Sequence, residues 1–177
     1  MVAYVAMLRG INVSGKNKIK MSELQALFVG LGNTDVTTYI QSGNVVFQSH
    51  EKNAVALTSA IEQRIVRALG FEVPVVVRTK AELAKVIAGN PLGADDLAKV
   101  HVTFLAQKPE AALVRAVADH RSPPDEFRIV GREVFLHCPS GYGKTKLNNT
   151  FWERKLKVGS TTRNWNTVTK LFELAGG

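Results

Sequence analysis

The stretch VTTYIQSGNVVF, at residues 36–47, is the part of the sequence from which the fold is predicted. Residues 36–40 alternate in the manner of a half-buried strand, and Ser42-Gly43 is typical of a two-residue turn. Residues 45–47 continue the alternation in a second strand. We therefore predict a β-hairpin.

A helix is predicted on each side of this hairpin. Residues 24–31 place Leu and Phe at the i, i+3, i+4 and i+7 positions that line one helix face. The segment Ser22-Glu23-Leu24-Gln25 has the pattern of a capping box, and Gly32 is expected to end this helix. Residues 57–69 form the second helical stripe, which Gly70 closes.

Apolar strands are predicted outside both helices, at residues 4–8 and 73–77. The resulting order of strand, helix, strand, strand, helix, strand is that of the ferredoxin-like split βαβ unit. A short helix follows, with a capping box at Thr79-Lys80-Ala81-Glu82. We predict a first ferredoxin-like half over residues 1–88.

The second half is predicted to repeat this order. Residues 89–98, rich in Gly, Asn, Pro and Asp, are the expected linker to a second half at residues 99–177. The predicted elements there are a strand at 100–104, a helix from 109, a hairpin at 127–136, and helices at 147–156 and 165–175. The predicted class is α+β, with two ferredoxin-like (βαββαβ) halves in tandem. The second half ends in helices, where a closing strand would be expected.

The composition indicates a soluble globular protein. The 177 residues are 45% hydrophobic and 21% charged. The single cysteine, Cys138, excludes an intrachain disulfide and a cysteine-based zinc site, and favours a reducing compartment. The longest apolar run, residues 1–8, is too short to span a bilayer and lacks the flanks of a signal peptide. We expect a cytoplasmic protein without membrane contact.

The formal net charge of +8 is concentrated toward the two ends of the chain. Residues 9–20 contain four Lys or Arg and no acid, and residues 144–170 contain seven against Glu153 alone. Such patches favour a polyanion or a phosphorylated ligand. A solvated basic surface that serves only solubility is the alternative.

The loop after the first strand and the hairpin loop are expected to be neighbours. The first two strands of a split βαβ unit run parallel, so these loops leave the sheet at the same edge. The side chains expected to come together are those of Arg9, Asn12, Lys16, Lys18, Gln41, Ser42 and Asn44. Guanidinium, ammonium and amide donors suit an oxyanion. In the alternative interpretation, the amide side chains only brace tight turns.

Two motifs are close to known nucleotide and RNA signatures without matching them. Residues 10–17 have the G-x-x-x-x-G-K spacing of a P-loop, but Asn17 stands in place of the hydroxyl residue. A Gly-rich basic loop that contacts an anion by another geometry is therefore expected. Tyr4 could act as a base-stacking ring of an RNA-recognition module, but residues 43–47 supply no matching aromatic platform.

No residue pattern identifies a catalytic centre. The four histidines show no metal-ligand spacing, and we expect neither a metal nor a cofactor. His101 and His137 could serve as bases, but nothing in the spacing pairs them with a nucleophile.

The start of the last predicted helix is a further candidate anion contact. Arg163, Asn164 and Asn166 lie where backbone donors already favour a negative charge. Capping of the helix by Thr162 or Asn164 is the alternative interpretation.

Four separated motifs follow one another in the order of a known family. They are MLRGINV at 7–13 with GKN at 15–17 and KM at 20–21, TYIQSGNVVF at 38–47, TKL at 145–147, and TTRNWNTV at 161–168. Through them the whole chain resembles the largely bacterial domain of unknown function 1697 family, with Thr145 where serine is common. The resemblance implies two ferredoxin-like halves and brings no established activity. Its signature positions are Arg9, Asn12, Gln41, Ser42, Asn44, Lys146, Arg163, Asn164 and Asn166.

These observations lead to one main hypothesis and two alternatives. The main hypothesis is a protein that binds an anionic ligand, either a nucleic acid or a nucleotide phosphate, on a basic, amide-rich surface. The expected ligand-binding residues are Arg9, Asn12, Lys16, Gln41, Ser42, Asn44, Lys144, Lys146, Arg163, Asn164 and Asn166. One alternative is a small enzyme that acts on a phosphorylated or carboxylate metabolite, and the other is an interaction module for an acidic protein partner. The sequence makes no prediction of the oligomeric state.

Overall fold

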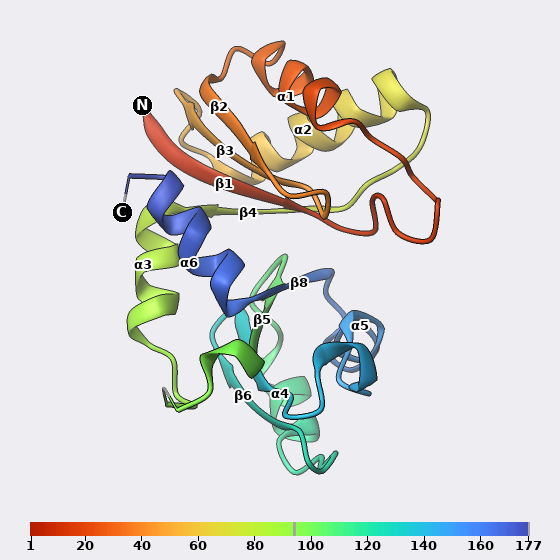
Figure 1. The fold of residues 1–177 in the computed structure, drawn as a ribbon, viewed down its shortest axis with the longest axis vertical. Coiled ribbons are helices and arrows are strands. Elements are labelled where there is room, and N and C mark those ends of the chain that lie inside the picture. Colours follow the sequence, from red (N-terminus) through yellow and green to blue (C-terminus); the bar gives the residue numbers. More distant parts are fainter. Residues whose placement is uncertain (94, 177) are drawn as a thin grey trace. The chain divides into compact units, whose positions relative to one another are not determined.

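The computed structural model describes residues 1–93 and 95–176, which form two units (Figure 1). The first unit contains Met1–Ala84 together with the C-terminal residues from Leu171, and the second contains Lys85–Lys170. Ala94, in the predicted linker, and Gly177 lie outside the described residues. Each unit is an α+β structure with its own four-stranded antiparallel sheet.

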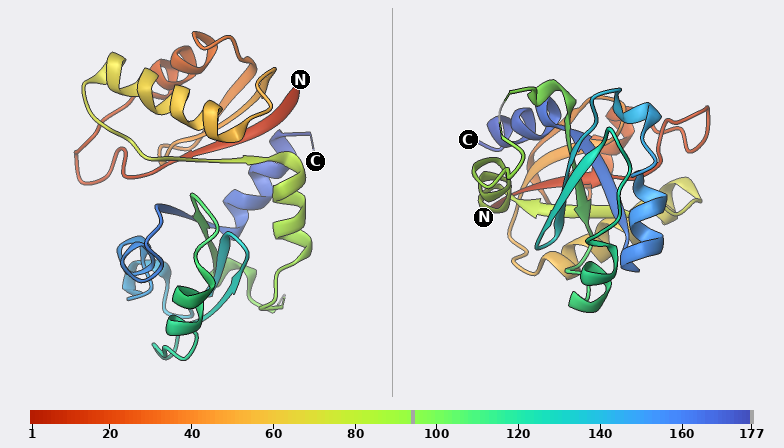
Figure 2. Two further views of the ribbon diagram at one scale, coloured as in Figure 1. Left: turned by 180° about the vertical axis from the view of Figure 1, so that it is seen from behind. Right: turned by 90° about the horizontal axis from the view of Figure 1, so that it is seen from below.

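The first unit has the complete ferredoxin-like order of elements. They are β1 (Val2–Leu8), α1 (Met21–Val29), β2 (Thr34–Tyr39), β3 (Asn44–Ser49), α2 (Ala54–Leu69) and β4 (Val75–Thr79). The strand order is β2-β3-β1-β4, and every neighbouring pair is antiparallel. Both helices cover the same face of the sheet (Figures 1 and 2). The core between them includes Tyr4, Ala6, Leu8, Leu24, Phe28, Phe47, Leu57, Ile61 and Ile65.

Two local predictions for the first unit are wrong. Helix α1 begins at Met21, so Ser22 lies inside the helix, and Lys20 is an N-cap without a side-chain hydrogen bond. The amide of Gln25 instead donates to the Val36 carbonyl oxygen at 2.8 Å. The hairpin turn has four residues, 40–43, because Tyr39 pairs directly with Asn44. The prediction for α2 is confirmed, since its C-cap Gly70 adopts a left-handed φ of +79°.

Helices α3 (Lys80–Ala88) and α6 (Trp165–Leu174) each contain a boundary between the two units. The predicted capping box of α3 is confirmed in both directions. The Glu82 amide donates to Thr79 Oγ1 at 3.1 Å, and the Thr79 amide donates to Glu82 Oε2 at 2.8 Å.

The second unit repeats the ferredoxin-like order. Its elements are the 3-10 turns η1 (Leu97–Lys99) and η2 (Tyr142–Lys144), the helices α4 (Ala111–Val117) and α5 (Asn149–Leu156), and the strands β5 (Val100–Leu105), β6 (Glu126–Val130), β7 (Glu133–His137) and β8 (Ser160–Asn164). The strand order is β6-β7-β5-β8. The core beneath α4 and α5 includes Leu105, Val117, Val134, Leu136, Leu147, Trp152 and Leu156.

Strand β8 corrects the prediction that the second half lacks a closing strand. Its sequence, STTRN, has no apolar alternation, but it pairs antiparallel with β5. The hydroxyls of Thr103 and Thr162 lie 2.7 Å apart across this pair, so polar contacts replace apolar packing along part of the edge strand.

None of the helices in residues 1–93 and 95–176 has the length and hydropathy of a membrane-spanning segment.

Candidate functional site

The structure brings together the two loops that the topology placed at one edge of the first sheet. β1 and β2 both pair antiparallel with β3, so they run parallel and end at the same side. The Leu8 amide donates to the Gly43 carbonyl oxygen at 2.8 Å. We call residues 9–20 and 40–44 together the two-loop surface.

Asn12 acts as a clamp, that is, its side chain hydrogen-bonds the backbone of both loops of the two-loop surface. Its Oδ1 accepts from the Ile19 amide at 2.9 Å, and its Nδ2 donates to the Ile19 carbonyl at 3.1 Å. The same Nδ2 donates to the Gln41 carbonyl oxygen at 2.8 Å, which ties one loop to the other. The expected ligand contact at Asn12 is thus occupied by backbone bonds, as in the alternative interpretation of turn bracing.

Asn44 also braces the backbone. Its side chain is fully buried, and its Nδ2 donates to the Tyr39 carbonyl at 3.0 Å and to Ser42 Oγ at 3.2 Å. Gly43 between them has a φ of +89°, and a Cβ there would lie 2.5 Å from Ile11 Cδ1. The hairpin therefore requires glycine at this position.

Left-handed backbone is concentrated on the two-loop surface. Asn12, Ser14, Asn17 and Ile40 supply four of the six non-glycine residues with positive φ in the described part of the chain. Ile40 is β-branched and 46% exposed, so this backbone strain is not compensated by deep burial of the side chain. Strain of this kind is often stored at functional sites.

A depression of about 710 Å³ opens between the two loops and the start of α1. It is lined by Asn12, Gly15, Lys18, Ile19, Lys20, Met21, Glu23 and Gln41. The lining contains two lysines and one carboxylate, and the first turn of α1 has no side-chain cap. Free backbone N–H groups and the helix dipole both favour an anion at this position.

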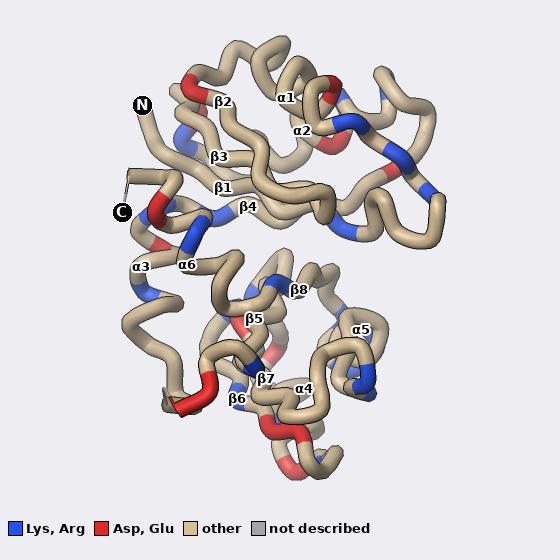
Figure 3. The backbone as a smooth tube through the Cα atoms, viewed as in Figure 1, with Lys and Arg blue, Asp and Glu red and all other residues tan. Residues whose placement is uncertain are grey.

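The remaining candidates of the first unit differ in exposure. Lys16, Gln41 and Ser42 are exposed, whereas Arg9 is half-buried and its amide donates to the Pro74 carbonyl at 2.9 Å. Lys and Arg recur along the segment that joins β1 to α1 (Figure 3). Lys18 and Lys20 line the depression, and sequence reasoning had not placed Lys20 there.

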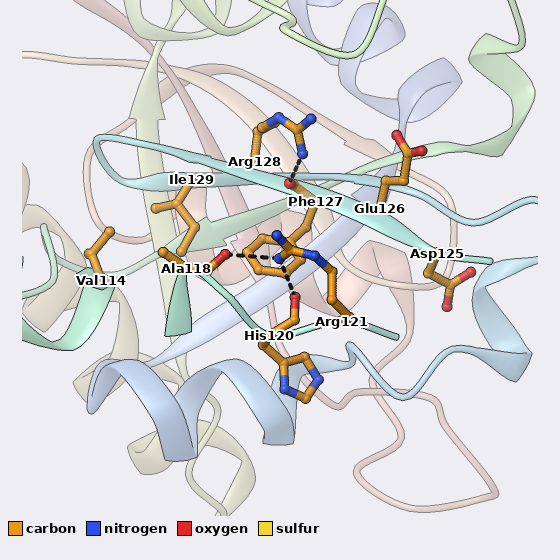
Figure 4. Close-up of a pocket in the computed structure, with 9 residues that line it drawn as sticks. All are labelled: Val114, Ala118, His120, Arg121, Asp125, Glu126, Phe127, Arg128 and Ile129. Carbon is orange, nitrogen blue, oxygen red and sulfur yellow. Dashed lines mark hydrogen bonds between the residues drawn. The ribbon is translucent and has the colours of Figure 1, made fainter. Parts of the chain in front are cut away.

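Lys144 and Lys146 belong to a second depression, within the second unit. Its volume is about 480 Å³, and it is lined by His120, Arg121, Ser122, Pro123, Pro124, Asp125, Ser140, Lys144 and Lys146. Sequence reasoning missed Arg121, which lies in the segment between α4 and β6 and belongs to no motif. A neighbouring depression of about 530 Å³ lies beside β6 and shares His120, Arg121 and Asp125 with it (Figure 4).

Arg163 and Asn164 hold the local backbone, whereas the side chain of Asn166 is exposed. The Arg163 side chain is 7% exposed, and its Nη1 donates to Thr161 Oγ1 at 2.8 Å and to the Thr162 carbonyl at 2.9 Å. Burial lowers the pKa of Arg163 to about 10, so it remains a cation at neutral pH. Asn164 Oδ1 accepts from the Thr167 amide at 2.8 Å and caps α6, whereas Asn166 is exposed.

Cys138 is buried and His101 is half-buried, and burial shifts the pKa of both toward the uncharged form. Burial and the nearby Asp125 raise the pKa of the Cys138 thiol to about 11, which disfavours the nucleophilic thiolate. Burial lowers the pKa of His101, which stacks on Tyr142 with ring centroids 4.9 Å apart. Tyr4 is 1% exposed and packs against Phe47 in the core, so it cannot stack a nucleic-acid base. Among the described residues, no cluster of His, Cys, Asp and Glu could hold a metal ion.

Comparison with known proteins supports the architecture. The conserved bacterial protein SP0830 from Streptococcus pneumoniae has a similar structure, with a TM-score of 0.80 over 98% of both chains. At 24% identity this likeness shows the shared fold. No curated protein matches the sequence. Residues 1–135 match the family described as "Protein of unknown function (DUF1697)", and the chain therefore belongs to the DUF1697 family.

Proposed function

We propose that this protein binds an anionic ligand, a nucleic acid or a nucleotide phosphate, on the two-loop surface. The observation that carries the proposal is the depression lined by Lys18 and Lys20 at the uncapped start of α1. Two ammonium groups and free backbone donors at one concavity are the usual elements of phosphate recognition.

The charge of the surrounding segment supports an anion. Residues 9–20 carry four bases and no acid, and Glu23 is the sole carboxylate in the lining of the depression. Lys16 extends the positive surface beyond the depression, since it is exposed on the same loop. An extended polyanion could therefore contact several of these side chains at once.

The two-loop surface is better suited to binding than to catalysis. The side-chain amide of Asn12 is occupied by backbone groups, and the amide of Asn44 bonds the hairpin loop. The depression is lined by neither His nor Cys, and Glu23 is its one candidate for a general base. A small enzyme that uses these groups to stabilise developing charge is consequently the weaker alternative.

The test is a titration of labelled single-stranded RNA and DNA pools at low and high salt. Three exposed lysines would be neutralised together in K16Q/K18Q/K20Q. The matched control K52Q/R64Q/R67Q removes the same charge from exposed positions of the same unit. If each lysine contacts a phosphate, the loop variant should bind at least tenfold more weakly. The slope of log K against log salt should also fall by about 2, at roughly 0.7 per contact on single strands.

The control variant should keep most of the affinity and of the salt slope. Equal losses in the two variants would show that only net charge matters, and would overturn the assignment to the two-loop surface. Binding that is absent from the native protein, or insensitive to salt, would overturn the function itself. Capture of an acidic protein that survives nuclease treatment would point instead to an interaction module.

A further inference from the structure

The depression of about 480 Å³ in the second unit has the features of a second, separate site. We propose that it binds a phosphate monoester, that is, a terminal phosphate group with two negative charges. Its residues all lie within the second unit, so this site is independent of the function proposed for the two-loop surface.

Lys144 and Lys146, on either side of Thr145, both line this depression. Thr145 between them is extended, with φ −73° and ψ 144°, and successive side chains of an extended segment alternate. The Thr145 side chain turns inward and is 8% exposed, whereas both lysines are exposed. Two exposed lysines that flank an inward-facing threonine thus line one concavity.

A part-buried hydrogen-bond network connects the walls of the depression. Thr145 Oγ1 donates to Asp125 Oδ2 at 2.6 Å and accepts from the Leu147 amide at 3.1 Å. The Asp125 amide in turn donates to the Ser122 carbonyl at 2.9 Å. The lysine-bearing loop is thereby tied to the segment before β6. A site that is ordered in advance binds more tightly because less conformational entropy is lost on binding.

Arg121 adds a third cation, which is exposed and hydrogen-bonded to two backbone carbonyl groups. Its Nη1 donates to the carbonyl oxygens of Ala118 at 3.2 Å and His120 at 3.0 Å (Figure 4). Among the described residues these are its hydrogen bonds, and they leave the donors on Nη2 and Nε for a ligand. A guanidinium held in this way can present two parallel donors to phosphate oxygens.

The net charge of the depression and the residues that line it favour a phosphate dianion as the ligand. Three cations face one carboxylate, Asp125, which already accepts the Thr145 hydroxyl, and the net charge of +2 matches a dianion. Ser122 and Ser140 add two hydroxyls that can donate to phosphate oxygens. Pro123 and Pro124 form an apolar wall. The one aromatic ring in the lining, that of His120, already packs against Phe151 with ring centroids 4.8 Å apart. The site is therefore built for a phosphate head group and has no platform for a stacked base.

The experiment follows the amide NMR signals of Ser122, Lys144 and Lys146 in the full chain during titration with inorganic phosphate, against sodium chloride at equal ionic strength. Phosphate should give saturable shifts at these amides, and chloride should not. R121Q/K146Q should weaken binding at least tenfold. K146R should retain it, as should K108Q/R115Q, a control at exposed positions of the same unit. Shifts that are absent, or equal in chloride, would overturn the proposal.

Two further probes identify the source of the phosphate. A short oligonucleotide with a 5′-phosphate and its 5′-hydroxyl counterpart are compared with inorganic phosphate. Tighter binding of the phosphorylated strand alone would support a nucleic-acid end, and affinity equal to that of inorganic phosphate would support a small phosphorylated metabolite. Equal binding of the two strands would overturn the preference for a monoester.

The same titration separates this site from the proposed function. K16Q/K18Q/K20Q, which disables the two-loop surface, should leave the phosphate shifts at Lys144 and Lys146 unchanged. A loss of those shifts in this variant would overturn the proposal of a separate site. Failure of the oligonucleotide test on the two-loop surface, with the phosphate shifts intact, would refute only the proposed function.

Discussion

Asn12→Ala should open the two-loop surface without unfolding the first sheet. The substitution removes the two part-buried hydrogen bonds to Ile19 and the exposed bond to the Gln41 carbonyl oxygen. Each part-buried bond contributes about 1 kcal/mol net, and an exposed bond contributes less because water replaces it. The expected local loss is about 2 kcal/mol, or roughly a thirtyfold rise in the open population.

Hydrogen exchange at the Ile19 amide measures this loss directly, because that amide donates to Asn12 Oδ1 in the native loop. Its protection factor should fall by roughly thirtyfold in N12A, while amides in the middle of β1 exchange as before. Unchanged protection at Ile19 would refute the assignment of Asn12 as a clamp.

Asn12→Asp separates the role of the amide donor from that of side-chain size. A carboxylate can still accept from the Ile19 amide, but its second oxygen would face two carbonyl oxygens that Nδ2 now satisfies. This repulsion raises the pKa of the introduced carboxyl in the folded state, so the destabilisation is present at neutral pH. It is relieved as the pH falls toward the ordinary value of about 3.9. At pH 7 the Ile19 amide should therefore be less protected from exchange in N12D than in N12A. In acid this difference in protection should shrink or change sign. A pH-independent difference would contradict this account.

Three other substitutions test separate parts of the fold. Gly43→Ala should lower the free energy of unfolding, measured by urea titration, by about 2–4 kcal/mol, because it combines positive-φ strain with a clash against Ile11. A loss below about 0.5 kcal/mol would contradict the clash with Ile11. Asn53→Ala removes the side-chain cap of α2 and should cost about 1 kcal/mol, with Asn53→Ser as a control that keeps a capping oxygen. Burial lowers the folded-state pKa of His101, partly opposed by a hydrogen bond to the Lys99 backbone, so the native protein should lose stability as the pH falls below about 6.5. His101→Phe should flatten that acid slope, and an unchanged slope would show that His101 does not cause it.

Most of the architecture could be predicted because burial leaves a periodic trace in the sequence. Leu57, Ile61 and Ile65 recur at helical spacing, and all three are buried against the sheet in α2. The residues of β8 leave no such trace. This edge strand pairs on one side only, and part of its stabilisation comes from the hydroxyl contact between Thr103 and Thr162, which apolar periodicity does not report.

The arrangement of the two-loop surface was predictable from topology, but the roles of its residues were not. Parallel β1 and β2 place the two loops together whatever their side chains are. Whether an amide turns inward or toward solvent depends on backbone angles that one sequence does not display. Asn12 has a φ of +54° and turns its amide onto backbone carbonyls, and Asn44 is fully buried. The same limit applies to Arg163, whose charge suggested a surface contact and whose side chain is buried.

The side chains of the two-loop surface divide into those that hold the loops and those that remain available. Asn12 and Asn44 hold the loops by satisfying backbone groups, so their specific donors cannot also distinguish one ligand from another. The groups that line the depression are the ammonium groups of Lys18 and Lys20 and the backbone at the start of α1, which recognise charge but not base identity, together with one exposed amide side chain, that of Gln41. The proposed recognition of nucleic acid by this surface should therefore be strongly salt-dependent and nearly independent of base sequence. If one base sequence were strongly preferred at fixed salt, the discriminating contacts would have to come from the Gln41 amide or from outside the two-loop surface.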